Sequence, residues 1–218
     1  MSIPGGATGK RPLVVALHGG ADKPEWACNE WRGVTEGHAF VVCPRGKGPP
    51  AGLFWNDPKE TLAAIDRAVA AVVREHGAWI AEGDRTLVGF SIGAAQAVHV
   101  VGMRPGEYPR VALSEGAYDL VDDAAFAPRL AKAGVRRVLF SCTTVGRCGT
   151  AYRGALPRLA KAGIEARVNL AGNLGHGLYV GAIQSLERDW GWFVGGAPSW
   201  AGFAPPSADG LPGSTATQ

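Results

Sequence analysis

The sequence predicts an α/β domain in which a mostly parallel sheet carries helices on both faces. Short apolar runs bounded by turn residues alternate along the chain with segments of helical periodicity, the pattern of βαβ units. Most of these runs are apolar at every position, as expected of strands covered on both faces. The chain of 218 residues is 46% hydrophobic, which is enough to bury one substantial core.

Six segments are expected to be strands, and consecutive ones are separated by helical or turn segments, which favours parallel neighbours. The segments are LVVAL (13–17), AFVVC (39–43), TLVGF (86–90), RVALS (110–114), RVLFS (137–141) and ARVNL (166–170).

The clearest helix lies between the second and third strands. Asp57 is its expected N-cap, Pro58 takes the first helical position, Glu60 completes a capping box and Gly77 ends the helix. Its apolar residues recur at helical spacing: Leu62, Ile65, Val69, Val72 and Val73.

The segment PRLAKAG occurs twice, at 128–134 and 157–163, each time before a strand. Two copies are too few for a solenoid, so we interpret them as two helix ends with a glycine C-cap. We expect a short extension at 1–11, one domain at 12–200 and a disordered, Pro/Gly/Ser/Thr-rich tail at 201–218.

The distribution of charged residues along the chain bears on which kinds of molecule the protein binds. The 22 basic and 19 acidic residues give a net charge of +3 and are scattered along the chain, which argues against a nucleic acid or a membrane surface as partner. No apolar segment approaches the length of about 20 residues that spans a bilayer. We expect a small-molecule substrate and a monomer or weak homodimer.

The four cysteines match no common zinc spacing, so no metal is expected. We predict two disulfides, Cys28 with Cys43 and Cys142 with Cys148, although four cysteines allow three connectivities. Two disulfides would favour an oxidising compartment, secreted or periplasmic, with a leader absent from this chain. Four reduced thiols would favour the cytoplasm.

The stretch LVGFSIGAA at 87–95 contains the candidate nucleophile. Ser91 lies between Gly89 and Gly93 where a strand ends and an alanine-rich helix begins, which is the setting of a nucleophile elbow. The tight turn needs both glycines and lifts the serine hydroxyl above the sheet. The alternative is a turn serine without chemistry.

A serine hydroxyl needs a base and donors for the developing oxyanion. His176, which follows the last strand, is the expected base, whereas His18 is expected to shape a loop. The backbone N–H groups of Ile92 and Gly20 are the expected oxyanion-hole donors. The alternative for the glycines after His18 is an ordinary strand-to-helix turn.

These motifs resemble the α/β-hydrolase superfamily, specifically the small esterases of the phospholipase/carboxylesterase and dienelactone-hydrolase-like kind. The matching residues are LHGG at 17–20, GFSIGA at 89–94 and GHG at 175–177, in the family's order, within 12–194. The resemblance implies the α/β-hydrolase fold and a Ser-His-acid hydrolase that cleaves carboxylic esters through an acyl-enzyme without a cofactor.

The acid departs from the family's pattern. Most members carry it after the strand at 137–141, where this chain reads CTTVGRCGT without Asp or Glu. A minority arrangement takes it from the end of the preceding strand, where we favour Glu115 over Asp119. The remaining alternatives are a dyad without an acid and a fold that no longer catalyses.

The substrate site is expected to be open, because about 22 residues separate the strands at 110–114 and 137–141, too few for a large lid domain. Trp26, Phe54 and Trp55 are expected to wall a pocket for short-chain or aromatic acyl esters, unless they are buried structural residues. Alternative functions are a non-catalytic ligand-binding protein on the same fold, and a serine peptidase or acyltransferase.

Overall fold

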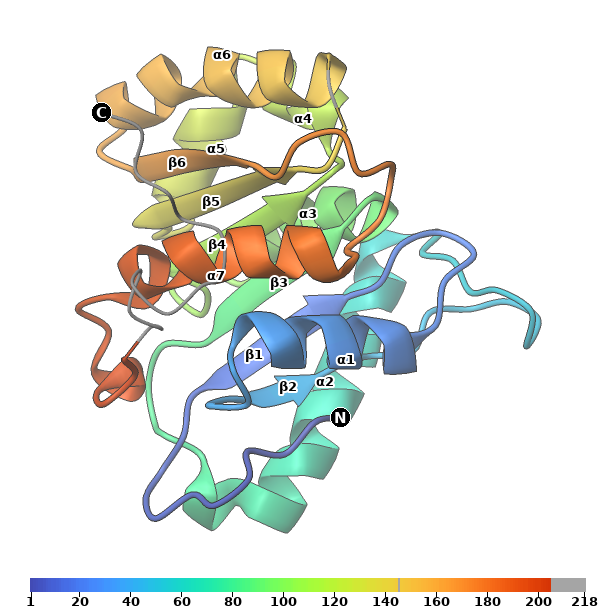
Figure 1. The fold of residues 1–218 in the computed structure, drawn as a ribbon, viewed down its shortest axis with the longest axis vertical. Helices are drawn as coiled ribbons and strands as arrows, with labels where there is room; N and C mark the ends of the chain where they lie inside the picture. The colour runs from blue at the N-terminus through green and yellow to red at the C-terminus, as the bar shows by residue number, and fades with distance from the viewer. Residues whose placement is uncertain (145, 205–218) are drawn as a thin grey trace.

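The computed structural model describes residues 1–144 and 146–204 and contains one sheet of six parallel strands (Figure 1). The strand order is β2-β1-β3-β4-β5-β6. The prediction of a mostly parallel α/β fold is confirmed. The strands are β1 (Leu13–Leu17), β2 (Phe40–Val42), β3 (Thr86–Phe90), β4 (Arg110–Ser114), β5 (Arg137–Cys142) and β6 (Glu165–Leu170).

Helices cover both faces of the sheet. In Figure 1, α1 and α7 lie side by side in front of it, while α2, α3 and α5 lie behind. Side chains alternate along a strand, so a strand that is apolar throughout contributes to two cores. In β1, Val14 and Ala16 pack in the core under α1 and α7, and Leu13, Val15 and Leu17 pack in the opposite core. The helices are α1 (Pro24–Val34), α2 (Pro58–His76), α3 (Ile92–Met103), α4 (Tyr118–Asp122), α5 (Phe126–Lys132), α6 (Arg147–Lys161) and α7 (Val180–Val194), with single 3-10 turns at Gly77–Trp79 and Pro198–Trp200.

The predicted helix ends are present with one difference. Asp57 caps α2 by accepting from the amides of Lys59 and Glu60. The Glu60 side chain pairs with the Lys47 ammonium instead of returning to the Asp57 amide, so the reciprocal half of the capping box is absent in the described chain. Left-handed glycines follow α5 and α6 at the ends of both PRLAKAG copies: Gly134 (φ +81°) and Gly163 (φ +77°).

The N-terminal segment is hydrogen-bonded to the edge of the sheet. Ser2 and Val41 exchange backbone hydrogen bonds of 2.8 and 3.0 Å at the free edge of β2. At the other end, Phe203 packs on Trp200, and residues 205–218 of the expected tail lie outside the described residues. Of the helices that the structure describes, none combines the length and apolarity needed to cross a bilayer.

The cysteines form the two predicted pairs. Cys28 of α1 bonds to Cys43 after β2, and Cys142 at the end of β5 bonds to Cys148 in the first turn of α6. The Cα–Cα separations are 5.7 and 5.8 Å. Two disulfides are compatible with an oxidising, extracytoplasmic compartment.

Glu30 on α1 is a partly buried carboxyl whose ionisation opposes folding. Burial raises the pKa of Glu30 to about 8, and the negative charge of Asp22 adds to this effect. A glutamate in an unfolded chain has a pKa of about 4.3. Because the folded pKa is the higher one, the neutral carboxyl's contribution to stability is complete below about pH 4 and is lost as the pH rises towards 8.

We therefore expect Glu30→Gln to raise the free energy of unfolding at pH 9 by about 1–2 kcal/mol, a value reduced for partial exposure to solvent. At pH 4 the effect should be small. For a chain of this size the gain corresponds to about 3–6 °C in Tm. Thermal unfolding at pH 4, 6 and 9 measures it, with the exposed Glu25→Gln as control. An equal change of Tm at all three pH values would contradict the expectation.

Candidate active site

Ser91 occupies a strained turn between β3 and α3. Its backbone is in the left-handed region, with φ +55° and ψ −121°. A Cβ at Gly89 would collide with the carbonyl of Gly93, and a Cβ at Gly93 would collide with the carbonyl of Leu17. The turn therefore excludes side chains on both sides of the serine, which explains the two glycines of the motif.

The sheet register brings Ser91 and Glu115 to neighbouring strand ends. The Ser91 amide donates to the Ser114 carbonyl at 2.8 Å, and the Glu115 amide donates to the Ser141 carbonyl at 3.0 Å. Each bond continues the ladder of parallel strands beyond the strand end. A Cβ at Gly116 would collide with the Ser91 carbonyl, a requirement for glycine that the sequence reasoning missed.

His176 lies between these two side chains. Its Nε2 is 3.0 Å from the Ser91 Oγ, and its Nδ1 is 3.5 Å from the Glu115 Oε2. The Phe90 ring packs beside the imidazole, with ring centroids 4.9 Å apart. The imidazole is half-exposed, whereas the Glu115 side chain is buried. The structure thus brings together a hydroxyl, an imidazole and a carboxylate in the order that a Ser-His-acid triad requires.

The Glu115 carboxyl is surrounded by donors. It accepts from the amide of Thr143, the amide of Thr144 at 2.6 Å, the hydroxyls of both threonines, and the Tyr118 hydroxyl at 2.9 Å. Burial, the largest single influence, raises the pKa of Glu115, but the hydrogen bonds from Tyr118, Thr143 and Thr144 together hold it below its ordinary value. The group is therefore a carboxylate at neutral pH and can stabilise a cationic imidazole.

Asp119 is not brought to His176. Its side chain is 91% exposed and pairs with Arg147 on the first turn of α6. Of the two candidate acids, only Glu115 lies against the imidazole in the part of the chain that the structure describes.

The two expected oxyanion-hole donors lie on adjacent segments. A Cβ at Gly20 would lie 3.7 Å from the Ile92 Cγ2. Neither the Gly20 nor the Ile92 amide donates to a protein acceptor within residues 1–144 and 146–204, whereas the Gly19 amide donates to Asp22 Oδ2 at 3.2 Å. Two amides that have no protein acceptor, on adjacent segments at the Ser91 turn, can donate to an oxyanion.

His18 shapes the loop that carries Gly20. Its Nδ1 is 2.7 Å from the Gly19 carbonyl oxygen, and its Nε2 accepts from the Gly46 amide at 3.1 Å. Because Nε2 accepts, the ring is neutral with its proton on Nδ1, and burial lowers the pKa of His18. Both ring nitrogens bond to the backbone, so His18 shapes the loop, as its place in the sequence predicts.

An open hollow of about 350 Å³ adjoins Ser91 and His176. Its apolar lining includes Ile92, Ala95, Tyr118 and Leu120. Tyr118 and Leu120 could not be predicted as lining residues from the sequence, because α4 is a five-residue helix that is too short to show a periodic pattern.

The expected aromatic walls are not part of this hollow. Trp55 is 4% exposed, and its indole N–H donates to the His18 carbonyl at 2.9 Å, which holds the ring beneath the loop. Trp26 and Phe54 are exposed, and neither lines the hollow beside Ser91. Phe54 instead lies against Gly20, where a Cβ would be 3.4 Å from its ring.

Glu115, Cys142 and Cys148 place three potential metal-binding atoms within 4.8 Å of one another. The two sulfur atoms are bonded to each other, so neither is a thiolate that could coordinate a metal. The chemistry of this group does not fit a metal centre.

Solved structures with the same fold include several esterases. Esterase PE8 is 20% identical, with a TM-score of 0.64 over 88% of this chain and 96% of its own. The Bacillus cereus carboxylesterase is 15% identical, with a TM-score of 0.58 over 84% and 87%. Arabidopsis thaliana SOBER1 is 19% identical, with a TM-score of 0.58 over 84% and 97%.

An uncharacterized protein from Bacillus cereus ATCC 10987 has a TM-score of 0.68 at 15% identity, and the match spans 60% of its length. No protein-family model and no curated protein sequence matches the chain. At these identities the similarity shows the fold alone: the chain has the α/β-hydrolase fold of small carboxylesterases.

Proposed function

We propose that this protein is a serine esterase that cleaves small carboxylic esters through an acyl-enzyme. The observation that carries the proposal is the contact of His176 with Ser91 Oγ on one side and with the buried Glu115 carboxylate on the other. The fold shared with carboxylesterases supports it at the level of architecture.

In the first step, Ser91 Oγ bonds to the ester carbonyl carbon while His176 Nε2 takes the serine proton. The carbonyl oxygen becomes an oxyanion and accepts from the Gly20 and Ile92 amides. Glu115 stabilises the imidazolium and fixes its tautomer. When the C–O bond breaks, the alcohol leaves with the proton from His176.

The second half releases the acid. A water molecule attacks the acyl carbon while His176 takes one of its protons, which generates a second oxyanion at the same donors. The bond to Ser91 Oγ then breaks, and the serine recovers its proton from His176. The products are one alcohol and one carboxylic acid, and no cofactor takes part.

The hollow favours a short-chain or aromatic acyl ester. Between β4 and β5 the described chain forms only α4 and α5, and this segment contains no lid domain. The lining by Leu120, Ala95 and the Tyr118 ring suits a small apolar group. We further propose that the protein acts as a monomer or weak homodimer in a secreted or periplasmic setting, in keeping with its two disulfides.

We expect the protein to hydrolyse p-nitrophenyl acetate and butyrate, and a fluorophosphonate to add to Ser91. Intact mass and peptide mapping identify the labelled residue, with Ser91→Ala as the control. A peptide p-nitroanilide tested in parallel separates a peptidase from an esterase. Ligand binding without hydrolysis or labelling would favour the non-catalytic alternative, and labelling of Ser91→Ala would refute Ser91 as the nucleophile.

A further inference from the structure

The three residues from Cys142 to Thr144 lie between the acid and the loop that carries the base. On the acid side, the amides of Thr143 and Thr144 both donate to Glu115 Oε1. The Thr144 hydroxyl reaches both carboxylate oxygens, at 3.0 Å to Oε1 and 2.9 Å to Oε2. Thr144 therefore fixes the rotation of the carboxylate group as well as its position.

On the base side, the carbonyls of the same segment hold the chain between β6 and His176. The Cys142 carbonyl accepts from the Ala171 amide at 2.9 Å, and the Thr143 carbonyl accepts from the Leu174 amide at 2.8 Å. The segment thus hydrogen-bonds to the acid through its N–H groups and to the base-bearing loop through its C=O groups.

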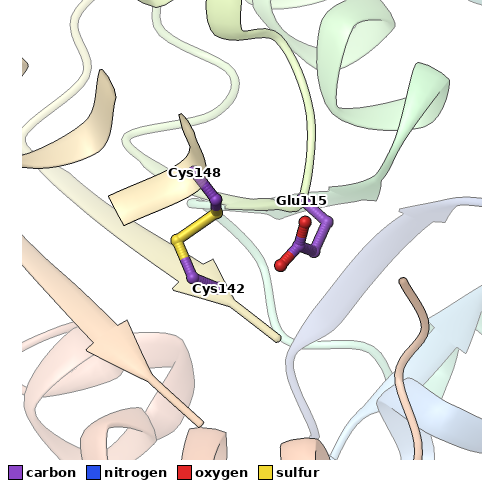
Figure 2. A group of neighbouring side chains, drawn as sticks. All are labelled: Glu115, Cys142 and Cys148. Carbon is purple, nitrogen blue, oxygen red and sulfur yellow. A yellow bond between two sulfur atoms is a disulfide. The ribbon is translucent and has the colours of Figure 1, made fainter. Parts of the chain in front are cut away.

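The Cys142–Cys148 disulfide anchors this segment beside the acid. Figure 2 shows the disulfide next to the Glu115 side chain. Both cysteines are 1% exposed, and the bond joins the end of β5 to the first turn of α6. It closes a loop that has five residues between the cysteines and includes Thr143 and Thr144.

The local chain supplies Glu115 with one side-chain donor, the Tyr118 hydroxyl at 2.9 Å from Oε2, while Oε1 receives its donors from Thr143 and Thr144. Glu115 has a left-handed backbone, with φ +50°, and its carboxylate is buried. A buried carboxylate is stable only if donors surround it. Its contact with the base, Oε2 to His176 Nδ1, is 3.5 Å, so a small rotation of the carboxylate decides whether it faces the imidazole.

We propose that Thr144, held by the Cys142–Cys148 disulfide, is a positioning residue that turns the Glu115 carboxylate towards His176. The inference rests on the proposed function for its effect on turnover. Thr144 itself does not touch the reacting atoms and acts through Glu115.

Thr144→Val removes the hydroxyl but keeps the amide and the shape of the side chain. We expect kcat for a p-nitrophenyl ester to fall by about 10–100-fold, with KM changed by less than about 2-fold, because only the alignment of the triad is altered. Thr144→Ser restores the hydroxyl and should restore most of kcat. Thr150→Val is the matched control, since the Thr150 hydroxyl bonds to Gly146 and not to Glu115.

A second test compares kcat and Tm of two variants, each of which lacks one of the disulfides. Replacing Cys142 and Cys148 by serine should lower kcat by a similar factor at a temperature where circular dichroism shows the fold intact. Replacing Cys28 and Cys43 should lower Tm but leave kcat within about 2-fold, because that bond does not adjoin Glu115. Equal losses of kcat in the two double variants would overturn the role of the second disulfide.

A proton NMR signal tests the positioning without turnover. A histidine Nδ1–H that donates to a carboxylate gives a far-downfield resonance, which His176→Ala assigns by its loss. Thr144→Val should shift or broaden it, while Thr144→Ser and Thr150→Val should preserve it. If the wild type gives the signal and the variants change it as expected, but the wild type cleaves no ester, the positioning stands and the proposed function fails. If it cleaves esters and Thr144→Val changes neither kcat nor the signal, the positioning is refuted.

Discussion

Ser91→Ala is expected to lower kcat for p-nitrophenyl butyrate by at least about 10⁴-fold with little change in KM. Alanine keeps the Cβ that the strained turn already accommodates but removes the only oxygen within reach of His176 Nε2 in the described chain. The remaining rate comes from substrate binding and the oxyanion-hole amides. Steady-state kinetics on both proteins measure the loss, and Tm should stay within a few degrees.

His176→Ala is the companion variant. Because the serine and the histidine act as one unit, His176→Ala and the double variant should each be about as slow as Ser91→Ala. Losses that multiply in the double variant would mean that the two residues act independently and would exclude the triad. Wild-type rates in Ser91→Ala would place the nucleophile elsewhere.

Glu115→Gln is expected to lower kcat by about 10³–10⁴-fold, again with a small effect on KM. The amide has no charge to stabilise the imidazolium, and its NH₂ group would face either the backbone N–H groups of Thr143 and Thr144 or the Nδ1–H of His176. Thermal unfolding should accompany the kinetics, because the same conflict lowers stability. Kinetic measurements are made well below the Tm of the variant.

Asp119→Asn is the matched control for Glu115→Gln. Asp119 follows Glu115 by four residues and lines the same hollow, but its carboxylate is exposed and pairs with Arg147. The kcat of Asp119→Asn should therefore stay within about 2-fold of the wild type. A large loss in Asp119→Asn with full activity in Glu115→Gln would reverse the assignment of the acid. Full activity in both would show that turnover needs no carboxylate at His176.

The sequence predicted best those features in which a physical requirement acts on neighbouring residues. The turn at Ser91 excludes side chains at Gly89 and Gly93, so the elbow is visible as a local pattern. A strand such as β1 supplies two cores at once, so it appears as an uninterrupted apolar run. Short loops closed by cysteines likewise suggested the two observed pairs.

Features that depend on contacts across the sheet could not be predicted in this way. Gly116 is required by the carbonyl of Ser91, which follows the neighbouring strand β3, and Thr143 and Thr144 acquire their contacts only where β5 ends beside β4. Trp55 is a residue for which the sequence suggested a contact that the structure does not contain. Its position in a loop suggested a pocket wall, but its bond to the His18 carbonyl buries it.

The loop between β6 and α7, which carries His176, is held by fewer contacts than the turn that carries Ser91. Residues 172–176 are exposed, and the described backbone hydrogen bonds of this loop to the rest of the chain are those of Ala171 and Leu174. Ser91, in contrast, lies on an elbow packed tightly against the ends of β1 and β4. Hydrogen bonds at such exposed loops open at a small fraction of the free energy of global unfolding. A chain in which this loop has opened would keep its sheet, both disulfides and Ser91 in place but would lose the contact with His176, so under the proposed function it would be folded and inactive.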